Sequence, residues 1–389
     1  DESVLIGAPS GTDSIVAGEF ALCRHFLTKP SSRVVYLCPV EAVCESVMGK
    51  WRAKFSNMCP REIVRMTGEV TIDLKLMESA SIIIATPRQW DMITRRWKQR
   101  KVVQSVALVI ADLLNYLGRP EIGPQYEIAL SRTRYISAQL EEAGGTRIRI
   151  VALSECLANA HDVADWLGCS PIAVFNFDAS SRSSPLRIHL QSFVFDDTVS
   201  SNQNLITAMT RPAFLSVLEA FDNEDPSEES SCTSIIYVDN RRQARSVAID
   251  FMTLAMAESA RIINSTSTTS DQFPSDYSLL VRGSPMPFDT PVNEATLSAL
   301  IPHGIAYFHE SLSANDKSIV SSLCQSGKVK LVIVSRTSLW DFEGMSPLVL
   351  VLGTHYYEGR ERRFIEYPLS DIFTMLGHAQ GRYFHSFNC

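Results

Sequence analysis

Short apolar runs rich in β-branched residues alternate with amphipathic stretches along the first half of the chain. Continuous apolar runs of this kind are typical of strands in a parallel sheet that is buried on both faces. They predict strands at residues 4–6, 34–38, 63–66, 82–85, 107–111, 148–153 and 172–175. The stretches between them predict helices at residues 15–26, 41–55, 87–95, 126–140 and 160–167.

A polar, proline-containing stretch at residues 178–185 interrupts this alternation, and we place a domain boundary there, between residues 1–180 and 181–389. Beyond it the alternation resumes, with strands expected at residues 187–195, 235–238, 305–308, 330–334 and 348–352. Residues 222–232 are acidic and serine-rich, and residues 264–277 are rich in serine and threonine, so both are expected to be surface loops. The pattern predicts an α/β protein with two successive lobes.

The composition is that of a globular protein and excludes several other classes. Of the 389 residues, 45% are hydrophobic and 20% are charged, and the length favours two domains. The net charge of −7 provides no global basic field for nucleic acid, although a local groove could still bind it. The nine cysteines form no C-x-x-C pair, which argues against a disulfide framework or zinc site and for a reducing compartment. No apolar run approaches the ~20 residues that cross a bilayer.

Residues 4–22 have the strand, small-residue loop and helix layout of a phosphate-binding loop. In such a loop, backbone N–H groups face phosphate oxygens, a lysine binds the β and γ phosphates, and the next Ser or Thr hydroxyl binds magnesium. The loop here holds Ser10, Gly11 and Thr12, and the positions for Gly-Lys-Ser/Thr hold Asp13, Ser14 and Ile15. Asp13 brings a negative charge to the place of the phosphates, Ser14 supplies no cation, and Ile15 has no oxygen for a metal. Taken alone, this stretch is more typical of an ordinary strand-to-helix turn.

Two successive α/β halves, the first of which opens with this layout, predict two tandem RecA-like lobes of the P-loop NTPase fold, each with a mainly parallel sheet covered by helices on both faces. Further segments, in order and at matching spacing, resemble the Ski-type branch of the superfamily-two RNA helicases. They include T-G-E at residues 67–69, T-P-R-Q-W-D at 86–91 and G-H-A at 377–379. The others are residues 73–76, 82–85, 95–101, 131–137, 149–154, 165–169, 175–177, 241–243, 304–310, 356–359 and 367–368.

Within this family, the chain is most similar to the C-terminal cassette of the spliceosomal members. The G-H-A segment favours these over the helicase subunit of the activating signal cointegrator complex, which stays open as an alternative identity.

The resemblance identifies where the chain departs from active members of the family. Their second motif reads D-E-x-H, and the matching residues here are Asp112, Leu113, Leu114 and Asn115. Asp112 could still approach a metal, or it could cap a strand end. Leu113 replaces the glutamate that activates water, because leucine cannot accept a proton, and Asn115 replaces the histidine that couples the ATP state to RNA.

The last motif of the motor, Q-x-x-G-R-x-G-R, is altered as well. Thr374 occupies its first position, and His378 replaces the first arginine. The second arginine is Gly381 or is displaced one place to Arg382. In addition, Glu155 and Asp341 stand where the family has small residues.

These departures predict that the chain does not hydrolyse ATP. An arginine finger alone contributes ~10³–10⁵ in rate to phosphoryl transfer, and the loop lysine, the magnesium hydroxyl and the water-activating glutamate are missing too. We therefore expect neither ATP with magnesium nor any other metal as a cofactor. ADP-like binding through the second lobe is left open.

The same resemblance provides a candidate RNA path. It consists of positions at which the family's lobes contact the RNA backbone, here Thr67, Gly68, Thr86, Pro87 and Arg241. The basic run at residues 95–101 is expected to be a solvated helix face rather than an RNA contact. Without ATP-driven closure of the lobes, any RNA contact is expected to be passive.

The resemblance therefore implies a catalytically inactive helicase cassette that acts as a scaffold and regulator in pre-mRNA splicing. The expected partners are an active cassette of the same chain, proteins of the U5 small nuclear ribonucleoprotein and other splicing factors, in the nucleus and without a membrane. We interpret the sequence as a segment of a longer protein, because a strand is expected close to each end. The alternatives are a weakly active RNA-dependent ATPase and a passive RNA-binding module.

Overall fold

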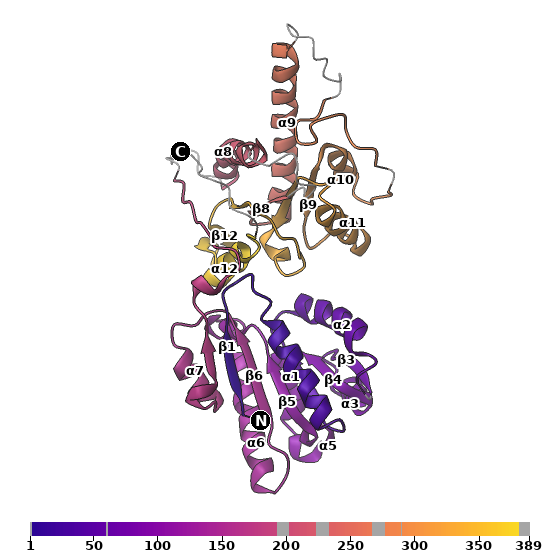
Figure 1. Cartoon of the computed structure of the whole chain (residues 1–389), viewed down its shortest axis with the longest axis vertical. Helices are drawn as coiled ribbons and strands as arrows, with labels where there is room; N and C mark the ends of the chain where they lie inside the picture. Colours follow the sequence, from indigo (N-terminus) through magenta and orange to yellow (C-terminus); the bar gives the residue numbers. More distant parts are fainter. Residues whose placement is uncertain are drawn as a thin grey trace. The chain divides into compact units, whose positions relative to one another are not determined.

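The computed structural model describes residues 2–59, 61–192, 202–222, 233–266, 277–288 and 290–380. The chain divides into two compact units, Asp1–Ser183 and Ser184–Cys389 (Figure 1). Each unit is an α/β domain with its own buried apolar core.

The first unit is built on a seven-stranded sheet in the order β3-β4-β2-β5-β6-β1-β7, and every neighbouring pair of strands is parallel. Alternate residues of a strand face opposite sides of a sheet. In β2, Val34 and Tyr36 therefore belong to one apolar cluster, whereas Val35 and Leu37 belong to the other. Both faces of the sheet are buried, as the continuous apolar runs predict. The strands are β1 (Val4–Gly7), β2 (Arg33–Leu37), β3 (Glu62–Arg65), β4 (Ala80–Ala85), β5 (Val106–Ala111), β6 (Arg149–Ser154) and β7 (Val174–Asn176).

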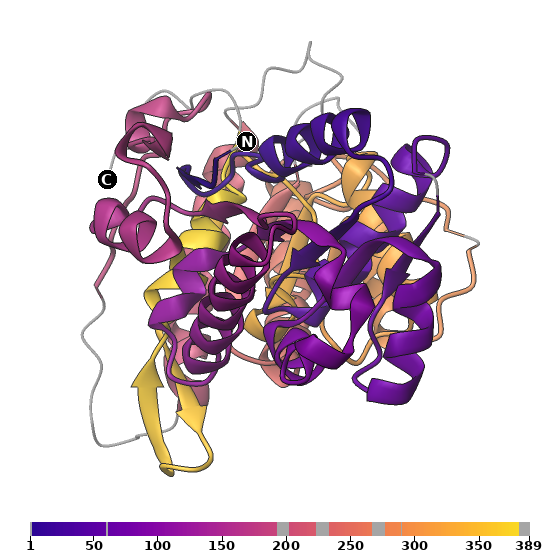
Figure 2. The ribbon, with the colours of Figure 1, turned by 90° about the horizontal axis from the view of Figure 1, so that it is seen from below.

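Helices cover both faces of this sheet (Figures 1 and 2). One face is covered by α1 (Ile15–Thr28) and α2 (Glu41–Phe55), which bury Leu22 and Trp51 against it. The other face is covered by α3 (Val70–Ser79), α4 (Pro87–Thr94), α5 (Lys101–Gln104), α6 (Gly123–Glu142) and α7 (Ala160–Leu167). Short turns complete the unit at η1 (Trp97–Gln99), η2 (Leu114–Gly118), η3 (Pro171–Ala173) and η4 (Ala179–Ser181).

The second unit has a four-stranded parallel sheet in the order β11-β8-β10-β9 and a separate antiparallel hairpin, β12–β13. Its strands are β8 (Ser234–Val238), β9 (Ile305–Phe308), β10 (Leu331–Ser335), β11 (Val349–Val351), β12 (His355–Glu358) and β13 (Arg363–Glu366). Its helices and turns are α8 (Asn202–Asp222), α9 (Arg241–Thr266), α10 (Ala295–Leu300), η6 (Ile301–His303), α11 (Ala314–Gln325), η7 (Arg336–Ser338) and α12 (Leu369–Gly377). A single apolar cluster, with Tyr237 and Phe251 fully buried, joins these elements.

Two strand predictions differ from the structure. At residues 172–175, the turn η3 comes first and β7 begins only at Val174. Residues 187–192 form no strand, and their apolar side chains are not buried, since Ile188 and Leu190 are 58% and 93% exposed. Residues 193–195 and nearly all of the loops expected at 222–232 and 264–277 lie outside the described residues.

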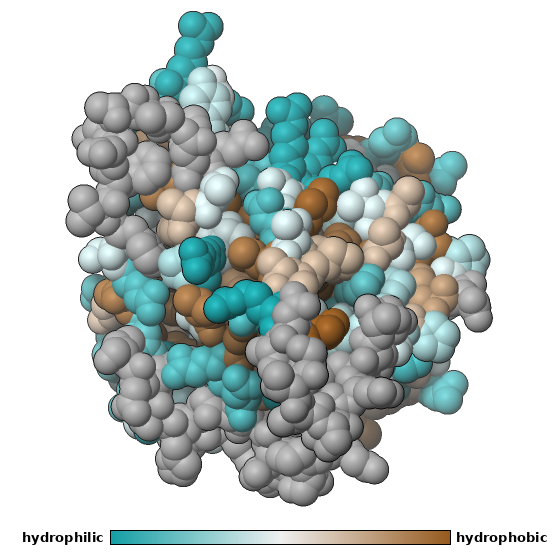
Figure 3. Space-filling model, turned by 90° about the horizontal axis from the view of Figure 1, so that it is seen from above, coloured by the Kyte–Doolittle hydropathy of each residue, from teal (hydrophilic) through white to brown (hydrophobic). Residues whose placement is uncertain are grey.

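None of the helices that the structure describes has the length and apolar content needed to cross a bilayer. On the face shown in Figure 3, hydrophobic side chains are interspersed with hydrophilic ones.

Candidate nucleotide site

The residues singled out in the first unit meet at the carboxyl edge of its parallel sheet. The loop 8–14 follows β1, Asp112 follows β5, and Glu155 follows β6. Because β5, β6 and β1 are neighbours in the sheet, these three segments lie next to one another. Open α/β sheets bind ligands at this edge, so the fold places the sequence-predicted residues where a nucleotide would bind.

Several backbone N–H groups of the loop and of the first turn of α1 donate hydrogen bonds to carbonyls of the loop itself. The N–H groups of Thr12 and Ser14 donate to the carbonyls of Pro9 and Thr12 at 3.2 and 2.8 Å. Those of Val16 and Ala17, in the first turn of α1, donate to the carbonyls of Asp13 and Ser14 at 3.1 and 3.0 Å. A phosphate-binding loop directs such donors at phosphate oxygens, and here these four are already occupied.

The side chains of the loop add no group that would attract a nucleotide. Gly11 has a φ of 81°, which glycine adopts without strain, and Thr12 donates its hydroxyl to the carbonyl of Pro9 at 2.6 Å. Asp13 is exposed, while Ser14 makes no capping hydrogen bond for α1. Ile15 packs against the apolar cluster beneath α1.

Glu155 joins this loop to the segment after β5. One carboxylate oxygen, Oε1, accepts a hydrogen bond from the Ser10 hydroxyl at 2.5 Å. The other, Oε2, accepts one from Asn115 Nδ2 at 3.1 Å. Burial raises the pKa of Glu155, against the opposing effects of the Ser10 hydrogen bond and the positive charge of Arg119. An anion of the protein therefore occupies the space between the loop and the second motif.

Asp112 is directed into the protein. Its side chain is 6% exposed, Oδ2 accepts from the Tyr36 hydroxyl at 2.5 Å, and Oδ1 accepts from the backbone N–H of Leu113 at 2.8 Å. Burial raises the pKa of Asp112, and these two hydrogen bonds act in the opposite direction. Both oxygens are thus engaged at the end of the strand, which is the arrangement of a cap rather than of an open metal ligand.

The two residues that follow in the motif are also held by the protein. Leu113 lies in the left-handed region at a φ of 53°, and its side chain packs against the apolar cluster beneath α1. Asn115 Oδ1 is buried, and no residue in the described part of the chain donates a hydrogen bond to it. Neither residue presents a base for water.

Sequence reasoning missed two residues of this edge, Tyr36 and Asn176. The side chain of Asn176 exchanges hydrogen bonds with the backbone of Leu157 at 2.8 and 3.1 Å. It also lies so close to Gly7 that a β-carbon there would come within 2.3 Å of its Oδ1. A polar residue at the end of each strand was the available signal for both.

In the second unit, His378 is partly buried against the rings of Tyr237 and Phe342 and does not act as a cation. Its Nδ1 shares a hydrogen bond with the hydroxyl of Tyr237 on β8 at 2.5 Å, and its carbonyl accepts from the N–H of Ser346 at 2.9 Å. Burial lowers the pKa of His378 to about 4, so the ring is neutral at neutral pH. Thr374 donates its hydroxyl to the carbonyl of Ser370 within α12, and Arg382 lies outside the described residues.

A second missed residue group lies around Arg336, just after β10. Its guanidinium forms ion pairs with Asp239 at 3.5 Å and Asp371 at 3.2 Å. It also lies 4.1 Å from the ring centroid of Tyr356 and 5.3 Å from that of Tyr367. Since two carboxylates and two aromatic rings surround it, this arginine organises the carboxyl edge of the second sheet.

The candidate RNA path begins at the carboxyl ends of β3 and β4. The carboxylate of Asp73 accepts hydrogen bonds from the N–H and hydroxyl of Thr67 and from the N–H of Gly68, at 2.7, 2.9 and 3.0 Å. Thr86 caps α4 through a reciprocal pair of hydrogen bonds with Gln89, with Pro87 at the first helical position. The geometry gives these residues local structural roles.

Arg241, the second-unit residue of this path, donates to the hydroxyl of Ser311 at 2.5 Å. It lies at the start of α9, which places it after β8.

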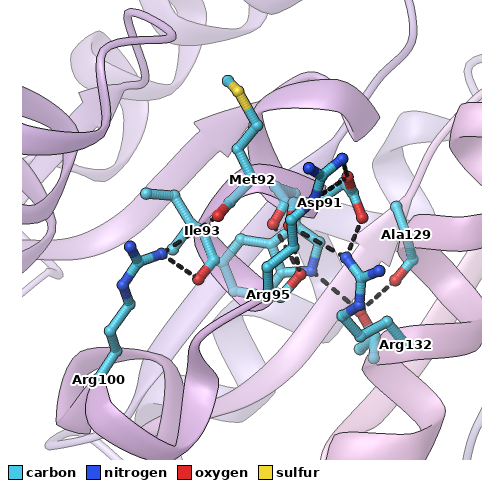
Figure 4. A network of polar contacts seen from close by, with 10 residues as sticks. Asp91, Met92, Ile93, Arg95, Arg100, Ala129 and Arg132 are labelled. Carbon is cyan, nitrogen blue, oxygen red and sulfur yellow. Dashed lines mark hydrogen bonds and ion pairs between the residues drawn. The ribbon is translucent and has the colours of Figure 1, made fainter.

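The basic run at residues 95–101 is partly engaged in a network between α4 and α6 (Figure 4). Arg95 and Arg132 both form ion pairs with the carboxylate of Asp91. Arg100 donates to the carbonyls of Met92 and Ile93 at the end of α4. These contacts favour a structural role for Arg95 and Arg100.

The described residues contain no group of three or more His, Cys, Asp or Glu side chains arranged to hold a metal ion.

Comparison with known proteins identifies the relationship. Residues 1–163 match the DEAD/DEAH box helicase family. Over 97% of its length, the chain is 36% identical to the U5 small nuclear ribonucleoprotein 200 kDa helicase of Homo sapiens and 38% identical to that of Drosophila melanogaster. It is also 36% identical, again over 97% of its length, to the pre-mRNA-splicing factor brr2 of Schizosaccharomyces pombe. The chain is homologous to a segment of these helicases. It spans 16% of the length of each of them.

Among solved structures, the fold is similar to that of the DUF1998 helicase MrfA bound to DNA and AMPPNP. The TM-score is 0.61 at 11% sequence identity, over 97% of this chain and 44% of that chain. This likeness, together with the two parallel sheets, confirms the predicted RecA-like α/β fold.

Proposed function

We propose that this chain is a catalytically inactive helicase cassette that acts as a scaffold and regulator of an active cassette in a spliceosomal helicase. The observation that carries the proposal is the Glu155 bridge, in which one carboxylate binds Ser10 of the loop and Asn115 of the second motif. Homology to spliceosomal helicases supports pre-mRNA splicing as the process, with other U5 proteins as partners.

The bridge disfavours a bound nucleotide for electrostatic reasons. Like charges in a partly buried site repel strongly, and phosphate oxygens would lie close to the Glu155 carboxylate with Asp13 nearby. A positive charge that acts on Glu155 belongs to Arg119, whose guanidinium lies 4.1 Å from the ring centroid of Tyr116. This cation is therefore already committed to the protein's own anion and ring.

The chemical step lacks its groups as well. Both oxygens of Asp112 accept hydrogen bonds from the protein, so binding magnesium would require breaking at least one of them. Leu113 cannot take a proton from water. His378 is neutral and held by Tyr237, so it cannot provide the charge that an arginine finger contributes, which is worth ~10³–10⁵ in rate.

A scaffold needs a surface for its partner, and α1 offers one. Val16, Phe20 and Leu27 lie on one side of this helix, because their spacing corresponds to whole turns, and they are 40%, 72% and 82% exposed. A row of exposed large apolar side chains is typical of a protein contact. We assign this row to docking of the active cassette or of splicing factors.

The proposal is tested by ATP turnover of the purified chain with magnesium and single-stranded RNA. We expect ATP to be hydrolysed no faster than in buffer without protein. The variant Asp112→Asn should give the same rate. RNA-stimulated turnover that Asp112→Asn abolishes would contradict the proposal and would favour the weakly active ATPase.

A further inference from the structure

A cavity lies at the opposite, amino edge of the first unit's sheet. It has a volume of about 200 Å³ and is lined mainly by side chains from the end of α1 and from residues at or just before the start of β6. Figure 2 looks onto this edge, where the N-terminus lies beside α1. Its polar lining includes Arg24, His25, Lys29, Arg147, Arg149 and Glu2.

The cations of this cavity exceed its anions. Glu2 is the acidic side chain of the lining, and its Oε2 accepts from the hydroxyl of Ser170 at 2.7 Å. Arg149 donates to the backbone carbonyl of Glu2 at 2.7 Å, which is a neutral acceptor. Within the described residues, Arg24, Lys29 and Arg147 form no ion pair.

These cations act on one another. Burial lowers the pKa of Arg149, and the charge of Arg24 lowers it further. Burial lowers the pKa of His25 to about 4, with added effects from Lys29 and Arg149. The His25 ring is therefore neutral at neutral pH, and its Nε2 shares a hydrogen bond with Ser32 Oγ at 2.6 Å. A bound anion would relieve this repulsion.

Basic residues at a helix C-terminus have an ordinary explanation, because the helix dipole places about half a negative charge there. That explanation fits Arg24 and Lys29, which lie at the end of α1. It does not account for Arg149, at the start of β6, and Arg147, in the loop just before it, which line the same cavity. In addition, the half negative charge at the helix C-terminus balances only a small part of the positive charge of the four basic side chains.

We propose that this cavity binds a phosphate group, as inorganic phosphate or as a phosphomonoester on a protein. Each water in the liquid occupies about 30 Å³, so the cavity has room for a phosphate group. Arginine forks match phosphate oxygens bidentately, and Thr28 adds a hydroxyl to the lining. The site is independent of the carboxyl edge of the sheet, so it stands whether or not the chain binds nucleotide.

The test is calorimetric titration of the whole chain with inorganic phosphate, at low salt and pH 7.5. We expect one-site binding that weakens roughly tenfold or more in the double variant Arg24→Gln, Arg147→Gln, because two charge-assisted contacts are lost. The matched control is Lys75→Gln, an exposed cation on α3, which should bind as the unaltered chain does.

A second readout follows the His25 ring by NMR. A dianion beside it favours the protonated form, so phosphate should raise the pKa of His25 from about 4. Tighter binding of a phosphoserine peptide than of inorganic phosphate would assign the site to a phosphorylated protein, and equal binding would assign it to free phosphate. Equal heats for the unaltered chain and the double variant, or an unmoved His25 titration, would overturn the proposal.

Discussion

At the scale of single residues, the Glu155 carboxylate accepts two hydrogen bonds, but burial of its charged form is unfavourable. Burial raises its pKa above the ordinary value, which means that the folded chain holds the charged form less favourably than water does. An acid with a raised folded pKa contributes stability that is complete below its unfolded pKa and is lost as pH rises through the folded pKa. The bridge is therefore weakest as a stabilising element at neutral pH.

We predict that Glu155→Gln raises the free energy of unfolding at pH 7 by about 1 kcal/mol. The amide keeps an acceptor for Ser10, and after rotation its NH₂ can donate to the buried Asn115 Oδ1. Urea unfolding at pH 7 and pH 4 measures the effect, which should vanish at pH 4. The control is Glu141→Gln, an exposed residue on α6. A loss of stability at pH 7 would show that the charge itself holds the loop.

Because the pKa of His378 is lowered, we predict that its contribution to stability depends on pH with the opposite sign to that of Glu155. A base whose folded pKa is depressed contributes stability that is complete above its unfolded pKa and is lost as pH falls through the folded pKa. For His378 this window runs from 6.5 down to about 4. Up to ~3 kcal/mol of the free energy of unfolding should be lost as the pH falls through this window.

Urea unfolding of His378→Gln at pH 7 and pH 4.5 checks this, since glutamine can still bond to Tyr237 without titrating. The variant should lose less stability between these pH values than the unaltered chain. Because the pKa of His25 is lowered to about 4 as well, His25→Gln serves as the matched comparison. Identical losses in the unaltered chain and His378→Gln would contradict the buried, neutral assignment.

At the scale of elements, α4 shows why the motif at residues 86–91 need not imply an RNA contact. The Thr86 hydroxyl accepts from the N–H of Gln89, and the Gln89 side chain accepts from the N–H of Thr86. We predict that Thr86→Ala lowers the free energy of unfolding by about 1 kcal/mol, whereas Thr86→Ser keeps most of it. Equal stability of the two variants in urea would show that the cap contributes nothing.

The sequence predicted the strands well because most of them are buried on both faces. Runs such as residues 82–85 and 106–111 are apolar throughout, and short runs of this kind rich in β-branched residues are typical of strands in a sheet covered on both faces. It failed at residues 187–192, where an alternating pattern has no partner strand. It also missed α3, where Asp73 is buried by the Thr67 turn and Ile72 is 44% exposed, so the helical face is irregular.

The candidate site was predictable in position but not in its contacts. The sequence predicted a strand before the loop, before Asp112 and before Glu155. The structure shows that these strands are neighbours, so their carboxyl ends share one edge of the sheet. The sequence could not show that Glu155 would reach Ser10, or that Tyr36 would bind Asp112, because both contacts depend on side-chain directions across the sheet. The inward position of His378 likewise depends on Tyr237, which is distant in sequence.

At the scale of the whole molecule, we propose that two RecA-like lobes persist although the groups that would hydrolyse ATP have been replaced. Each lobe is stabilised by apolar burial, which does not depend on the phosphate loop. The chain corresponds to 16% of the length of the spliceosomal helicases to which it is homologous. Under the proposed function, this lobe pair has lost its own catalysis and serves an active cassette of a longer helicase.

The most direct test of this account is calorimetric titration of the purified chain with a non-hydrolysable ATP analogue and magnesium. No binding heat is expected up to millimolar analogue, because the N–H groups of Thr12 and Ser14 are occupied within the loop and Glu155 stands between the loop and Asn115. One-site binding at micromolar analogue, weakened by Asp112→Asn, would contradict it and would show that the nucleotide site still works.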